Sequence, residues 1–328
     1  MTTTEILAKI RNLSALVVGD ICLDRWCMYD PSLAEPSRET NIPRIGVVSG
    51  VVTPGAGGTV ANNLAALGTG KVAVLGVIGD DGHGHELKKA LRARGIGSDH
   101  LIEAPGMQTF TYTKLMDVRN GVEDLPRVDF VNASPLLPEV ERQVLDRLQL
   151  VIENFDVVVV SDQAETHQGG VVTPAVRDLI AELAPAYPEK IFFVDSRMRI
   201  EHFRRVIVKP NHDEAQAACM RAFGAISYPR LLRHVEGKLL IVTHGGDGVL
   251  LVTPSGESWV KTKKVENPVD ICGAGDSFTS GAALALAAEA SPAVAARFGN
   301  QVASITIMKK GTGTASPAEL LAHEDARD

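Results

Sequence analysis

The sequence contains few cysteines, and their positions do not indicate a disulfide framework or a structural zinc site. Four occur in 328 residues, at Cys22, Cys27, Cys219 and Cys272, and they are scattered rather than grouped in the two pairs that a structural zinc site needs. Cys272 adjoins a glycine loop, but no histidine stands near it in the sequence to activate it as a nucleophile. We expect reduced thiols in or near the core.

Long apolar runs and an excess of basic residues are also missing. No stretch of about 18 apolar residues occurs, and the N-terminal segment has no basic region followed by an apolar one, as a secretory leader would. The 33 Lys and Arg are outnumbered by 40 Asp and Glu, which argues against a surface that neutralises nucleic-acid phosphates. No Gly-x-Gly-x-x-Gly follows the first expected strand, which disfavours a nicotinamide-dependent enzyme. We therefore expect a cytoplasmic protein that acts on a small molecule.

The apolar residues that are present form short β-branched runs alternating with longer segments of helical period. ALVVGD at 15–20 and VVVVSD at 157–162 are typical of buried strands, whereas VANNLAALG at 60–68 and DEAQAACMRAFG at 213–224 are typical of helices. The alternation predicts an α/β fold of three layers, with a mostly parallel central sheet covered by helices on both faces. Residues 1–328 are expected to form a single domain.

Two segments in the first half of the chain break this rhythm. The insertions at about 38–54 and 105–131 contain stretches that alternate polar and apolar residues and carry Thr, Tyr and Lys. They predict a small β-sheet lid over the mouth of the main sheet, and the alternative is an edge hairpin without a role in binding. Unpaired strand edges favour a homodimer formed through this lid.

A glycine loop near the C-terminus carries the strongest chemical signal. ICGAGDSFTSGAALA places Gly273, Ala274 and Gly275 directly before an Ala-rich helix, where converging backbone N–H groups and the helix dipole favour an anion. Asp276 in the same turn would repel that anion, unless it serves as a base for an attacking hydroxyl. The spacing alone is equally compatible with Asp276 acting only as a helix cap.

GAGDSF followed by a small-residue helix closely resembles the C-terminal signature of the ribokinase-like (PfkB) carbohydrate kinase family. The resemblance extends in order over nearly the whole chain. It implies a ribokinase-like fold, ATP and Mg²⁺ as cofactors, an anion hole formed by Gly273, Ala274 and Gly275, and Asp276 as the catalytic base. A K⁺ site beside the anion hole occurs in some relatives, and the sequence does not decide whether one exists here.

The metal and phosphate region is expected at two strand ends. In KPNHDEA (209–215), Asn211 and Glu214 have the spacing of a helix capping box, and they also resemble the family's Asn-x-x-Glu motif, which organises Mg²⁺ and its waters. These two roles are compatible. Asp195 ends the strand of VDSR (194–197) at the carboxyl edge of the sheet, where open α/β sheets bind ligands, and is a second candidate for the metal.

Three residues resemble nucleotide-binding positions of the family. Thr243 and Gly245 lie in LIVTHGGDGVLL (240–251), which resembles the strand and glycine turn beside the nucleotide, although a hairpin turn needs no ligand. Asn300 resembles a polar position that faces the adenine pocket, and a polar residue on an exposed helix face is the alternative.

The N-terminal half supplies the expected sugar contacts. LVVGDICLDRW (16–26) resembles the family's first strand and the acidic turn after it, with Asp20 and Asp24 as candidates for sugar hydroxyls. PGAGGTVANNLAALG (54–68) resembles the first family signature, with Gly57, Gly58 and Asn62, although the neighbouring Asn63 leaves the register ambiguous.

GDICLDRW and the inserted PSRETNIPRIGV resemble the heptose-phosphate kinase branch, which phosphorylates the anomeric hydroxyl of a heptose 7-phosphate. A phosphorylated substrate needs cations, and Lys114 lies in the expected lid together with Arg38 and Arg44. SDQAETHQGG (161–170) keeps Asp162, another substrate candidate, but lacks the Tyr and Lys of that branch, so the sugar stays open. The alternatives are a kinase for a nucleoside or free sugar, and a catalytically silent binding protein.

Overall fold

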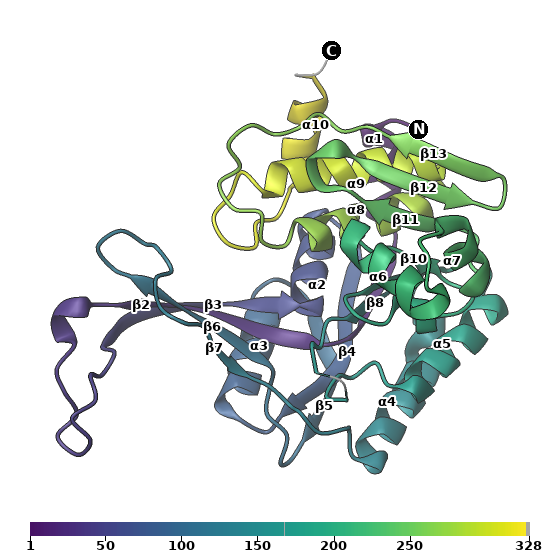
Figure 1. The fold of residues 1–328 in the computed structure, drawn as a ribbon. Coiled ribbons are helices and arrows are strands. Elements are labelled where there is room, and N and C mark those ends of the chain that lie inside the picture. Colours follow the sequence, from purple (N-terminus) through teal and green to yellow (C-terminus); the bar gives the residue numbers. More distant parts are fainter. Residues whose placement is uncertain (167, 326–328) are drawn as a thin grey trace.

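The protein is built around a large twisted sheet that lies between two layers of helices, with a smaller sheet extending from it (Figure 1). The computed structural model describes residues 1–166 and 168–325. The strands of the large sheet are β1 Ser14–Gly19, β4 Lys71–Gly79, β5 Gly97–Ala104, β8 Val157–Asp162, β9 Ile191–Ser196, β10 Ile207–Val208, β11 Leu240–Thr243, β12 Val249–Thr253 and β13 Gly256–Val260. Their order is β13-β12-β11-β10-β9-β8-β1-β4-β5, and β12 and β13 are antiparallel additions at one edge.

Ten α-helices are found in the described part of the chain, and most of them cover the two faces of this sheet. They are α1 Thr3–Ile10, α2 Gly57–Ala66, α3 Gly82–Arg92, α4 Pro138–Val151, α5 Pro174–Ala186, α6 His212–Phe223, α7 Tyr228–His234, α8 Ala274–Ala287, α9 Pro292–Thr306 and α10 Pro317–Asp325. Among the described residues, no helix is both long enough and apolar enough to cross a membrane.

Two separate cores follow from the alternation of side chains along each buried strand. In β8, Val157 and Val159 pack on the side of α1, α2, α8 and α9, whereas Val158 and Val160 pack on the side of α4, α5, α6 and α7. A strand that is buried on both faces must be apolar at every position, and this explains the unbroken valine run. The predicted three-layer arrangement with a mostly parallel sheet is therefore found.

The smaller sheet, which we call the lid, projects away from the main body (Figure 1). Its strands are β2 Ile21–Tyr29, β3 Val47–Ala56, β6 Thr111–Asp117 and β7 Val128–Phe130, in the order β3-β2-β6-β7. β2 lies outside the two insertions expected from the sequence, because the chain passes from β1 into the lid at Asp20. The expected acidic turn after the first strand is thus wrong in one respect, since Asp24 lies inside β2.

Candidate active site

The glycine loop lies at the N-terminus of α8. Gly273 is the N-cap with φ of 77°, a left-handed conformation that costs glycine little, and no side chain caps this helix end. The backbone N–H groups of Gly275 and Asp276 therefore remain available for an anion, whereas the Ala274 N–H donates to the Ile271 carbonyl at 3.2 Å. Asp276 lies in the first turn but does not accept a capping hydrogen bond, which removes the alternative of a simple helix cap.

Two pockets meet at this loop. The first, a cavity of about 150 Å³ between the lid and the main sheet, is lined by Gly273 and Asp276 on one side. The second, of about 370 Å³, is lined by Ala274 and Gly275 and by residues of β11 and α9. A group held by the loop's N–H donors is thus accessible from both pockets.

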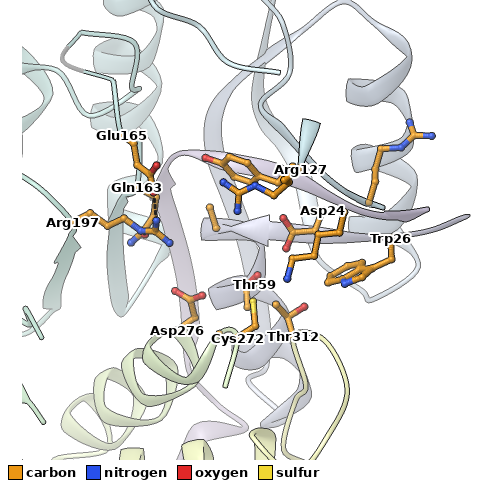
Figure 2. A pocket seen from close by; sticks show the side chains of 15 residues that line it. Asp24, Trp26, Thr59, Arg127, Gln163, Glu165, Arg197, Cys272, Asp276 and Thr312 are labelled. Atoms are coloured by element: carbon orange, nitrogen blue, oxygen red, sulfur yellow. Dashed lines mark hydrogen bonds and ion pairs between the residues drawn. The ribbon is translucent and has the colours of Figure 1, made fainter. Parts of the chain in front are cut away.

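The lid supplies one wall of the first pocket. Asp24 and Trp26 of β2 lie opposite Tyr112 and Lys114 of β6, and all four line the cavity (Figure 2). Residues two apart on a strand point to the same face, so these pairs present a carboxylate, an ammonium and two rings together. Burial raises the pKa of Asp24 to about 6, against the opposing charge of Lys114.

The second pocket brings together the three residues that the sequence suggested for nucleotide binding. Thr243, Gly245 and Asn300 all line it, together with the apolar side chains of Phe278 and Ile307. The Asn300 amide nitrogen Nδ2 is buried and has no hydrogen-bond partner in the described part of the chain. An unpaired amide donor in a mostly apolar cavity is suited to a heteroatom of a planar base.

Asp276 is half-buried and lies beside three other charged groups, the buried Asp195 and Lys209 and the exposed Arg197. Burial raises its pKa to about 7, and the Asp195 carboxylate adds to the rise while Lys209 and Arg197 oppose it. A carboxyl group with a pKa near neutrality is well matched to accept a proton during turnover.

The two metal candidates, Asp195 and Glu214, differ in the partners that their carboxylates have. Asp195 forms a buried ion pair with Lys209, with 3.0 Å between Oδ2 and Nζ, and it also accepts a hydrogen bond from Thr279. Glu214 and Asn211 form the predicted capping box, in which Glu214 Oε2 accepts the Asn211 backbone N–H. Burial and the charge of Asp195 raise the pKa of Glu214, so a cation near these carboxylates would be favoured.

Asp20 and Asp162 are buried and do not line the first pocket. Asp20 accepts backbone N–H groups of Gln163, Ala164 and Val171, at 2.8 Å each. Asp162 pairs with Arg199 at 2.9 Å. Asp20 thus holds the loop that follows β8 directly. Asp162 accepts from Ser196 and from Arg199, and Arg199 in turn donates to the Ala164 carbonyl of that loop.

The two neighbouring asparagines of α2 have different surroundings. Asn63 is buried, donates to the Thr59 carbonyl and accepts from Ser277 Oγ, so it joins α2 to α8. Asn62 is half-buried and is not among the residues that line the first pocket, whereas Thr59 is. Gly57 and Gly58 pack tightly, since a Cβ on them would lie 2.8 Å from Ile21 and 2.6 Å from Pro54, respectively.

Comparison with known proteins agrees with this geometry. The model of the pfkB family carbohydrate kinases matches residues 14–319. The chain belongs to the PfkB carbohydrate kinase family. The predicted family is confirmed, and the chain is an ATP-dependent sugar kinase.

Among curated relatives of this PfkB kinase, the bifunctional protein HldE of Pelobacter propionicus is 31% identical over 340 residues, covering 98% of this chain and 66% of the relative. The chain therefore spans just under two thirds of that relative's length.

Two solved structures share the fold. The ribokinase of Thermotoga maritima has a TM-score of 0.69 and 22% identity, covering 95% of this chain and 99% of that one. Phosphofructokinase-2 of Escherichia coli in complex with potassium has a TM-score of 0.72 and 19% identity, covering 96% and 100%.

Several residues of the PfkB site were missed from the sequence. Trp26, Thr59 and Arg127 line the first pocket, and the loop after β8 adds Gln163. Thr59 follows Gly57-Gly58 by one position, and that closeness to the signature was the available signal. Lys209 could have been found as a lysine placed between a buried strand and the Asn211 cap, a position where an ammonium requires a carboxylate partner.

Proposed function

We propose that this kinase transfers the γ-phosphoryl group of ATP to a hydroxyl of a sugar or sugar phosphate held under the lid. The observation that carries the proposal is the position of the glycine loop, which lines both the lid pocket and the apolar pocket beside β11 and α9. The sugar would occupy the first pocket, and ATP would occupy the second with its phosphates on the loop.

The loop and Asp276 have complementary roles in the transfer. The substrate hydroxyl oxygen attacks the γ-phosphorus, and the bond from that phosphorus to the bridging oxygen breaks, leaving its electron pair on ADP. The hydroxyl proton passes to the Asp276 carboxylate. Backbone N–H groups of Gly273 and Gly275 stabilise the charge on the transferring oxygens, while the Ala274 N–H is held by the Ile271 carbonyl. Phosphoryl transfer requires positioning and charge neutralisation more than a strong base, which a carboxylate with a pKa near 7 satisfies.

Glu214 is the residue we assign to the Mg²⁺ that accompanies ATP. The Glu214 Oε2 atom accepts the Asn211 N–H, and Oε1 would accept a hydrogen bond from a metal-bound water. When bound, Mg²⁺ would neutralise part of the charge of the ATP phosphates. We leave Asp195 out of this site, because its ion pair with the buried Lys209 already neutralises the charge of its carboxylate.

Asp24 and Lys114 are the proposed sugar contacts. Asp24 accepts hydrogen bonds from sugar hydroxyls, which suits a carboxylate at the wall of the cavity. The lid also lines the pocket with Arg25, Lys114 and Arg127, each beside an acidic residue of the chain. The Lys114 pair with Glu123 is long at 3.5 Å, so this ammonium has the most freedom to bind a phosphate.

We therefore propose a heptose 7-phosphate as the substrate, with its anomeric hydroxyl at Asp276, in line with the relation to HldE. ADP release is measured against heptose 7-phosphate, fructose 6-phosphate, ribose and adenosine, in potassium and in sodium buffers. We expect kcat/KM for the heptose phosphate to exceed that for the unphosphorylated compounds by about 10- to 100-fold, the worth of one or two charge-assisted hydrogen bonds. A nucleoside or free sugar as the best substrate would contradict this assignment.

A homodimer through the lid is a further part of the proposal. The distal half of β3 exposes Val47, Val48 and Val51, with 64% of Val51 accessible, and Figure 1 shows this end of the lid clear of the main body. An apolar edge strand of this kind needs a cover in solution. We expect the wild type to be dimeric by light scattering and Val51→Lys to be monomeric. Leu150→Lys, at an exposed site on α4, is the control and should stay dimeric. A monomeric wild type would refute the lid interface.

A further inference from the structure

Arg197 is a cation at the acceptor end of the first pocket that the mechanism above does not use. It follows β9 by one residue and lines the cavity together with Asp276. Figure 2 shows its guanidinium on the same side of the pocket as the Asp276 carboxylate, away from Asp24 and Trp26. The position is therefore close to where the hydroxyl and the γ-phosphoryl group must meet.

Two side chains of the loop after β8 hold Arg197 in place. Its Nε donates to Gln163 Oε1 at 2.8 Å, and its Nη1 is paired with Glu165 Oε1. The same loop is fixed from beneath by Asp20, through three backbone N–H groups. These contacts use Nε and one terminal nitrogen, and the remaining N–H donors of the guanidinium stay available for a ligand.

The other cations of the site are less suited to this position. Of the cations described as lining the first pocket, Arg25, Lys114 and Arg127 all belong to the lid side, and Arg197 alone comes from the main sheet. Lys209 lies nearby but is only 3% exposed and is paired with Asp195. The charged groups that act on Asp276 are Asp195 and Arg197 from the end of β9, Lys209 from the end of β10 and Asp24 from the lid.

We propose that Arg197 is a catalytic residue that donates hydrogen bonds to the transferring phosphoryl group, opposite the backbone N–H groups of the glycine loop. This inference rests on the proposed kinase function. In this step the hydroxyl oxygen bonds to the γ-phosphorus, ADP leaves with the electron pair of the broken bond, and Asp276 takes the proton. Arg197 gains and loses no bond or proton. Its fixed charge offsets the charge that the phosphoryl oxygens share in the transition state.

The test compares Arg197→Met and Arg197→Lys with the wild type on the sugar that gives the fastest ADP release. For Arg197→Met we expect kcat to fall about 10²- to 10³-fold, the effect of losing one preorganised donor, with KM for the sugar changed less than threefold. Arg197→Lys should recover part of the loss in kcat, because it restores the charge without the two-pronged geometry. Glu165→Gln is the matched variant, since it removes the ion pair and keeps the guanidinium, and its kcat should fall far less.

A binding measurement separates contact with the transition state from a structural role. With sugar present, Arg197→Met should bind ADP with aluminium fluoride, a mimic of the transferring phosphoryl group, at least tenfold more weakly. Its affinity for the ATP analogue AMP-PNP should change less than threefold. The inference fails if kcat of Arg197→Met stays within threefold of the wild type, or if both nucleotides lose affinity alike. A wild type without turnover on any sugar would instead refute the proposed function.

Discussion

Asp276→Asn is expected to lose activity and to gain stability at the same time. Without a carboxylate to accept the hydroxyl proton, kcat should fall about 10²- to 10⁴-fold, the usual contribution of a positioned general base. KM for ATP should change little, because the backbone N–H groups of the glycine loop are untouched. The measurement is steady-state ADP release with the best sugar of the panel.

The gain in stability follows from the cost of burying the charge of Asp276. Its pKa rises from 3.8 to about 7 on folding, so the folded protein holds the proton more tightly than the unfolded chain does. The contribution of this group to stability is therefore fully present below pH 3.8 and is lost as the pH rises through 7. At pH 8 the carboxylate costs about 4 kcal/mol, which an uncharged amide avoids in large part. Urea unfolding at pH 8 should show Asp276→Asn to be the more stable protein.

The pH profile gives a second measure of the same group. In the wild type, kcat/KM should fall tenfold for each pH unit below about 7, because only the deprotonated carboxylate accepts the proton. The residual activity of Asp276→Asn should lack this limb. Equal turnover by wild type and variant, or an unchanged acidic limb, would remove Asp276 from the mechanism.

The parts of the fold that were predictable are those in which one local pattern decides the structure. The valine run at 157–160 has no polar position, so it fits a strand buried on both faces, and β8 (Val157–Asp162) begins with it. The capping box of Asn211 and Glu214 was equally clear, because both of its hydrogen bonds are local. β2 was missed because Asp24 and Arg25 interrupt its apolar pattern. Their charges are accommodated by the pocket and by Glu86 of α3, which the local sequence does not reveal.

The candidate site shows the same division between local and long-range information. The glycine loop is continuous in the sequence, and Asp276 could be placed beside it from spacing. The roles of Asp20 and Asp195 could not, because their partners lie in other segments: the loop after β8 for Asp20, and Lys209 at the end of β10 for Asp195. An acid at the end of a strand is compatible with a ligand contact or with an internal ion pair, and only the fold distinguishes them.

The buried pair of Lys209 and Asp195 carries the second large expected effect, on folding rather than turnover. Lys209 is 3% exposed, and burial alone would lower its pKa, but the charges of Asp195 and Glu214 hold it above the ordinary value. Lys209→Met leaves the Asp195 carboxylate buried and without its counter-charge, which should lower the free energy of unfolding by about 3–5 kcal/mol. Urea unfolding at pH 7 measures this change. Lys89→Met, at an exposed position of α3, is the control and should stay within about 0.5 kcal/mol of the wild type.

A double variant shows whether the loss comes from the unpaired charge or from packing. In Lys209→Met with Asp195→Asn, the buried carboxylate is gone, and Thr279 can still donate to the amide oxygen. Its destabilisation should therefore be smaller than that of Lys209→Met alone, because an uncharged amide costs less to bury than an unpaired carboxylate. Strictly additive losses would mean that the two side chains stabilise the fold independently.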